Sequence, residues 1–148
     1  MSTMHRALRL ARAAAARNEV PVGAMVLAPD GTVLAEAANQ VEQDRDASAH
    51  AELLAMRAAA HRLGSPRLPG CTLVVTLEPC PMCAAAAVHF RVARIVFGAY
   101  DPKGGGVEHG PRLFDQPGCL HRPEIIGGVQ EQACGDLLRA FFAGLRAS

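Results

Sequence analysis

Two short segments of the chain carry the residues whose chemistry is most specific. His50 and Glu52 lie two positions apart, and Cys80 and Cys83 follow later in the run Pro79–Cys83. Imidazole nitrogen and thiolate sulfur are preferred zinc ligands, and catalytic zinc sites use three protein ligands and leave a fourth position to water. His50, Cys80 and Cys83 meet that requirement. The pattern therefore predicts a zinc site that activates water, with the Glu52 carboxylate carrying protons rather than binding the metal.

The spacing of the two cysteines predicts that they share one face of a helical turn. Prolines at positions 79 and 81 indicate the start of that helix, because proline is tolerated in the first turn. The positive end of the helix dipole also favours thiolates at this position. We therefore expect Cys80 and Cys83 to lie at a helix N-terminus.

The spacing of His50 and Glu52 constrains where the metal lies. Side chains two positions apart on a regular helix diverge by about 200°. They converge only beyond the N-terminal end of the helix, because side chains tilt in that direction. Ser48 is the predicted N-cap. Both motifs are thus expected to open a helix, with two helix N-termini facing one metal.

Ligand spacing alone leaves a structural zinc site open. In that alternative Glu52 is only solvated, and the protein is a non-catalytic, zinc-stabilised binding module. The acid two positions from a ligand argues against it, since a structural site has no use for such a group. The fourth ligand of such a Cys3His site would be Cys71, Cys119 or Cys134.

Composition predicts one globular domain over residues 1–148, because half of the 148 residues are hydrophobic. An odd number of cysteines, with no recognisable secretory leader and no apolar run of transmembrane length, predicts a cytoplasmic protein with reduced thiols. The net charge of +1 argues against a strong general attraction to nucleic acid.

Hydrophobic periodicity predicts strands that alternate with helices, which is typical of a three-layer α/β fold. Pro29-Asp30-Gly31 indicates a hairpin turn. The aperiodic segment 101–123 is rich in glycine and proline, and a loop of this length in a compact domain is usually functional. The expected helices are 3–17, 50–63, 81–90 and 130–146, and the expected strands are 20–27, 32–37, 71–77, 94–98 and 124–126.

Several runs outside the zinc motif carry a resemblance over almost the whole chain. They are Asn18–Ala24, Ala49–Glu52, Thr76–Cys80, Phe97–Ala99, Asp101–Gly105, His121-Arg122 and Phe141-Phe142. With them the sequence resembles the cytidine/deoxycytidylate deaminase superfamily and, within it, the bacterial tRNA-specific adenosine deaminases, whose zinc signature is H-x-E followed by P-C-x-x-C. The resemblance implies a mixed five-stranded sheet, one Zn²⁺ per chain and a homodimer. It also implies deamination of adenosine to inosine at the wobble position of a tRNA anticodon loop, usually that of an arginine tRNA with an ACG anticodon.

The resemblance further implies a set of substrate contacts. Asn39 matches an asparagine that hydrogen-bonds the target nucleotide, although an asparagine that ends a strand in a turn is common. Without the resemblance, the segment with Asp101 and Lys103 is explained as a turn, and Phe142 and Arg146 as part of an amphipathic terminal helix that buries its phenylalanines. These other implied contacts with RNA are Asp101, Lys103, His121, Phe142 and Arg146.

The chain also departs from the family pattern near the implied RNA contacts. Leu120 stands where asparagine commonly precedes the His-Arg pair, and Val107-Glu108-His109 replaces a stretch of small residues. These changes leave the zinc motif intact. A deaminase of a free nucleobase or nucleoside, of guanine or cytosine type, would share every zinc residue, so that alternative also stays open.

Overall fold

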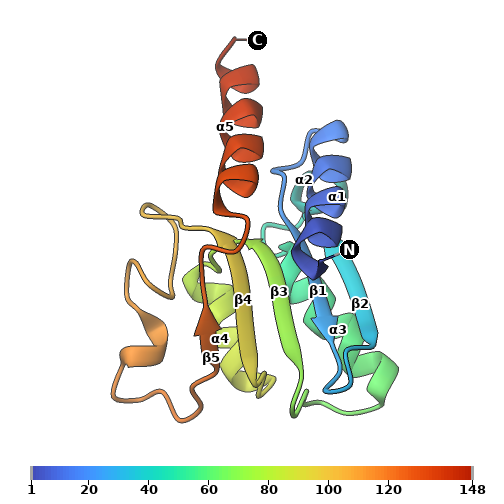
Figure 1. Cartoon of the computed structure of the whole chain (residues 1–148), viewed down its shortest axis with the longest axis vertical. Coiled ribbons are helices and arrows are strands. Elements are labelled where there is room, and N and C mark those ends of the chain that lie inside the picture. Colours follow the sequence, from blue (N-terminus) through green and yellow to red (C-terminus); the bar gives the residue numbers. More distant parts are fainter. Residues whose placement is uncertain (1, 148) are drawn as a thin grey trace.

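Five strands form one mixed sheet in the computed structural model, which describes residues 2–147 (Figure 1). The strand order is β2-β1-β3-β4-β5. Strand β1 is antiparallel to both of its neighbours, whereas β3, β4 and β5 are mutually parallel. This arrangement confirms the expected α/β class and the mixed five-stranded sheet. The strands are β1 (Gly23–Leu27), β2 (Val33–Ala38), β3 (Thr72–Leu77), β4 (Arg94–Ala99) and β5 (Glu124–Ile126).

Helices cover both faces of the sheet. Helices α3 (Ala51–Leu63) and α4 (Pro81–His89) pack on one face, in a core with Leu73, Val75 and Phe97. Helices α1 (Thr3–Ala16) and α5 (Glu131–Ala147) cover the other face, and α5 continues beyond the end of the sheet (Figure 1). No helix within residues 2–147 has both the length and the apolar character needed to cross a membrane.

Small residues let the helices approach the sheet closely. A Cβ atom added at Gly23 would collide with the carbonyl oxygen of Ala7, so β1 and α1 touch through their backbones. The alanines on the inner face of α3 are fully buried in the same way on the opposite side of the sheet. Short side chains bring each helix near the sheet, and the high alanine content therefore suits a thin three-layer structure.

Two details of the expected secondary structure are wrong. The segment between β2 and α3 is not all loop, because it contains the short helix α2 (Val41–Asp44). The N–H groups of Glu42 and Gln43 at its start donate to the buried Glu19 carboxylate, at 3.1 and 2.8 Å, and this distant cap has no local signature. Strand β1 begins at Gly23 rather than position 20, because Val22 turns back onto the carbonyl of Val20.

Candidate active site

The two sequence motifs lie at the starts of two neighbouring helices. His50 is the N-cap of α3 and Cys80 is the N-cap of α4, both with extended backbone angles. Their carbonyls accept the first helical hydrogen bonds, from Leu54 at 3.0 Å and Ala84 at 2.9 Å. The expectation that both motifs open a helix is confirmed. The predicted cap at Ser48 is wrong, because its hydroxyl bonds to Asp46 instead.

The three ligand side chains converge on one point. The Nδ1 atom of His50 lies 3.6 Å from the Sγ atom of Cys80 and 3.6 Å from that of Cys83. Tetrahedral zinc with Zn–N bonds of about 2.0–2.1 Å and Zn–S bonds of about 2.3 Å places nitrogen and sulfur about 3.6 Å apart. His50, Cys80 and Cys83 are therefore spaced as zinc ligands.

The remaining cysteines do not complete a four-ligand structural site. Within residues 2–147, none of them joins the metal-binding group. Cys119 donates its thiol to the carbonyl of His121 at 3.1 Å, and buried Cys134 lies against β4 beside Gly98. Cys71 is buried and donates to the carbonyl of Pro69 at 3.7 Å. The three-ligand arrangement is that of a catalytic zinc site, with a coordination position left for water.

Protons are divided unequally between the two ligand thiols. The hydrogen bond from Cys83, together with that from His50, lowers the pKa of the Cys80 thiol to about 4. The hydrogen bond to Cys80 and burial raise the pKa of the Cys83 thiol, and the hydrogen bond with Cys80 raises the pKa of His50. A cation bound among them favours the deprotonated forms, so zinc binding should release protons here.

Glu52 lies in the first turn of α3 and is 4% exposed. It lines a cavity of about 470 Å³ together with His50 and Cys80. Burial raises the pKa of the Glu52 carboxyl to about 7. A nearby cation acts in the opposite direction and favours the carboxylate. Glu52 is thus placed where a side chain can exchange protons with a group in the cavity.

Asn39 forms part of the wall of this metal-bearing cavity. The N–H of Ala51 at the start of α3 donates to its Oδ1 atom at 2.8 Å, and its side chain is mostly buried. This bond fixes the amide relative to His50, one residue from Ala51. It leaves the Nδ2 group, which has no protein acceptor within residues 2–147, as a donor at the cavity wall.

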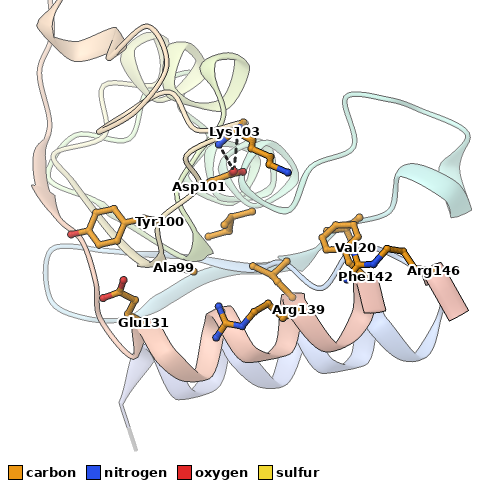
Figure 2. Close-up of a pocket in the computed structure, with 13 residues that line it drawn as sticks. Val20, Ala99, Tyr100, Asp101, Lys103, Glu131, Arg139, Phe142 and Arg146 are labelled. Atoms are coloured by element: carbon orange, nitrogen blue, oxygen red, sulfur yellow. Dashed lines mark hydrogen bonds between the residues drawn. The ribbon is translucent and has the colours of Figure 1, made fainter. Parts of the chain in front are cut away.

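A second cavity, of about 790 Å³, lies along α5 (Figure 2). It adjoins the first, because the two share lining residues. Phe142 and Arg146 line it from α5, and Asp101 and Lys103 line it from the loop after β4. The Oδ1 atom of Asp101 accepts hydrogen bonds from the backbone N–H groups of Lys103 at 3.2 Å and Gly104 at 2.9 Å. The two cavities share Val20, Leu77, Asp101 and Gly104.

His121 lies apart from both cavities. Its Nε2–H group donates to the carbonyl oxygen of Val92 at 2.6 Å, and it is not among the residues that line either cavity. Leu120 beside it is 87% exposed. The structure therefore gathers the other five implied substrate residues around the two cavities and gives His121 a structural hydrogen bond.

Two residues at the site were not predicted from the sequence as functional residues. Phe141, rather than Phe142, reaches the metal-bearing cavity from α5. Glu78, directly before the Pro79-Cys80 turn, has a fully buried side chain. Burial acts to raise its pKa, but the N–H of Asp101, the His109 side chain and further loop N–H groups outweigh it and hold the pKa below its ordinary value. An acid that ends an apolar strand hints at such a role, but its donors are distant in sequence.

Comparison with known proteins agrees with this geometry. Residues 1–99 match the family described as the cytidine and deoxycytidylate deaminase zinc-binding region. The chain belongs to this family. A tRNA-specific adenosine deaminase of Agrobacterium fabrum is 50% identical over 139 residues, which cover 94% of this chain and 91% of that protein.

Solved structures of similar proteins share the fold. One from work on A-to-I editing by tRNA:A34 deaminases at the wobble position of transfer RNA has a TM-score of 0.89 and 47% identity, covering 91% of this chain and 97% of that one. A guanine deaminase from Nitrosomonas europaea has a TM-score of 0.82 and 27% identity, covering 95% and 82%. With the ligand geometry, these matches identify the site as the zinc centre of a deaminase.

Proposed function

We propose that this protein deaminates adenosine to inosine at the wobble position of a tRNA anticodon loop. The observation that carries the deamination chemistry is the buried Glu52 carboxylate in one cavity with a three-ligand zinc site. Its support from relatives is the 50% identity to a tRNA-specific adenosine deaminase over nearly the full length of both chains. An arginine tRNA with an ACG anticodon is the proposed substrate.

The chemistry assigns a role to each residue of the centre. His50, Cys80 and Cys83 would hold zinc, and the chemistry that zinc would supply when bound is a lowering of the pKa of water toward about 7. Glu52 takes a proton from the attacking water and delivers it to N1 of adenine. It then passes a proton to the amino group that leaves C6 as ammonia. The overall change consumes one water and converts adenosine to inosine.

The two adjoining cavities suit a base held beside its neighbours in a single strand. We assign the target nucleotide to the metal-bearing cavity, where the Nδ2 group of Asn39 can donate to it. Lys103, Arg146 and Phe142 line the second cavity. The two basic side chains supply positive charge for flanking nucleotides, and Phe142 supplies an aromatic face. Anticodon loops have unpaired bases, so little energy is needed to extrude the target. The RNA contact implied for His121 stays a prediction.

The test is inosine formation, measured by mass spectrometry, in an arginine-tRNA anticodon stem-loop incubated with zinc-loaded protein. Free guanine, cytosine, adenosine and cytidine are run in parallel, because the resemblance to guanine deaminase makes a free base the main alternative. Inosine at the wobble adenosine alone supports the proposal. Ammonia release from a free base or nucleoside, with no inosine in RNA, contradicts it while keeping the zinc chemistry.

Three further proposals concern the whole protein. We propose that residues 1–148 act as one deaminase domain, that two copies form a homodimer, and that the protein works in the cytoplasm, where tRNA is modified. Light scattering coupled to size-exclusion chromatography measures the oligomeric state directly, and a monomeric mass at working concentration would contradict the dimer.

A further inference from the structure

We infer that Glu78 is a positioning residue that fastens the loop 101–109 against the metal-bearing turn and so sets the wall of the substrate cavity. The part of this inference that concerns substrate rests on the proposed function. Glu78 is not a metal ligand in the structure, and the deamination chemistry gives it no role of its own. Its side chain nevertheless accepts more hydrogen bonds than any other in residues 2–147.

The buried Glu78 carboxylate accepts hydrogen bonds from N–H groups along the loop. Its Oε1 atom accepts from the N–H of Asp101 at 3.0 Å and from Nδ1–H of His109 at 2.8 Å. Its Oε2 atom accepts from the N–H groups of Val107, Glu108 and His109, at 3.2, 2.9 and 3.1 Å. The Glu78 side chain is 0% exposed, so no water competes for these donors. All five hydrogen bonds come from one loop, and both ends of the loop are held.

Glycines allow the loop to approach this closely. A Cβ atom at Gly105 would collide with Oε2 of Glu78, and one at Gly106 would lie 2.6 Å from the nitrogen of Pro81. The N–H of Gly106 also donates to the carbonyl of Pro79 at 2.8 Å. The loop therefore lies directly on the metal-bearing turn that carries Cys80. These contacts join that turn to the segment after β4.

A second set of hydrogen bonds carries this anchoring to the cavity. Glu78 fixes the backbone of Asp101, and the Asp101 carboxylate in turn accepts from the N–H groups of Lys103 and Gly104. Asp101 and Gly104 line both cavities, and Lys103 lines the second (Figure 2). Losing the Glu78 carboxylate would release the wall at these positions. The metal ligands at the two helix starts would stay, because their positions depend on the helices.

The inference predicts a specific kinetic signature for Glu78→Gln, which keeps the side-chain shape but turns an amide donor toward backbone donors. We expect KM for the stem-loop to rise at least about tenfold, with kcat per bound zinc changed less than about threefold. A role in stability alone would lower the folded, zinc-loaded fraction and leave KM unchanged. An unchanged KM in the zinc-loaded variant would overturn the inference.

Two further variants keep the test decisive if Glu78→Gln does not fold. Gly105→Ala leaves the carboxylate intact but pushes the loop away from it, and should raise KM in the same way. His109→Ala removes one of the five hydrogen bonds and should give a smaller rise. Glu36→Gln is the matched control, because Glu36 lies on the far edge strand β2, where its carboxylate pairs with Arg6 of α1. Unchanged KM in both loop variants would refute the positioning role.

Hydrogen exchange separates this inference from the proposed function. In Glu78→Gln, or in Gly105→Ala, the amides of residues 101–109 should exchange at least about tenfold faster, while those of α3 keep their protection. Glu36→Gln should change neither. If the wild-type protein deaminates no RNA but the loop amides lose protection, the proposed function fails and the anchoring by Glu78 stands. Unchanged loop exchange in the variants would overturn the anchoring whatever the substrate.

Discussion

The helix starts that carry the ligands and the loop 101–109 border the same cavity, but different interactions hold them. His50 and Cys80 are N-caps, so the local backbone of α3 and α4 fixes their direction. The loop has no helix or strand over these positions and depends on Glu78, which is at least 23 residues away along the chain. Local geometry thus holds the chemistry, whereas a long-range hydrogen-bond network holds the proposed substrate wall.

This difference predicts that changes in the two regions separate chemistry from binding. Damage to a helix start should abolish turnover and leave the loop in place. Damage to the loop should weaken substrate binding and leave the zinc in place. Two of the changes below act on the helix starts and two on the loop and α5, ordered by the size of the expected effect.

Cys83→Ser should have the largest effect. It removes one of three protein ligands, and we expect zinc affinity to fall about a hundredfold or more and deamination to become undetectable. Zinc content by inductively coupled plasma mass spectrometry, with inosine formation, measures both. Cys119→Ser is the matched control, since Cys119 lies outside the zinc group and its thiol donates to the carbonyl of His121. Full zinc occupancy and activity in Cys83→Ser would refute the ligand assignment.

Glu52→Gln should come next, because it removes the proton carrier and keeps the metal. The amide has the same shape but cannot take a proton from water, so kcat should fall by about 10²- to 10⁴-fold. Zinc content and KM should change little, because the ligands are untouched. Glu124→Gln, on exposed β5, serves as the control. Substantial turnover in the zinc-loaded Glu52→Gln variant would show that another group moves the proton.

The same contrast explains what could be predicted from the sequence. The ligand set, the two helix starts, the five strands and the four longer helices all follow from local signals such as Pro81 and hydrophobic periodicity. The roles of Glu19 and Glu78 could not be predicted, because each carboxylate accepts from N–H groups more than 20 residues away. Hydrophobic alternation and capping residues depend on neighbours along the chain. The hydrogen-bond partners of a buried acid come from distant segments, which only the fold brings together.

The stability contributed by Glu78 should depend on pH in a defined direction. Its pKa is held below the ordinary value of 4.5 in the folded state, so the folded protein binds fewer protons than the unfolded chain as pH falls. Its contribution is therefore fully present above about pH 4.5 and is lost as pH falls through the lowered pKa. We expect Glu78→Gln to cost about 2–4 kcal/mol in the free energy of unfolding at pH 7.

Urea unfolding of the wild type and of Glu78→Gln, with equal excess zinc from pH 7 down to pH 4, measures this difference. The gap in unfolding free energy should stay constant down to about pH 4.5 and begin to close below it. Zinc loss at low pH affects both proteins alike and so cancels in the difference. A gap that widens on acidification would mean that the protonated form of Glu78 stabilises the loop, which the five donors around it argue against.

Phe142→Leu should give the smallest effect, and it tests whether the second cavity binds RNA at all. Phe142 is 40% exposed and meets Phe141 edge to face. Leucine at this position of α5 preserves much of the apolar contact with Phe141 but removes the aromatic face. If a base stacks there, the loss of about 1–3 kcal/mol should raise KM for the stem-loop roughly 5- to 150-fold with kcat unchanged. Phe142→Tyr keeps the ring and should keep the wild-type KM. Equal KM values in both variants would mean that Phe142 only packs against its neighbours and does not contact RNA. The loop that Glu78 holds would then be the remaining part of the proposed substrate wall.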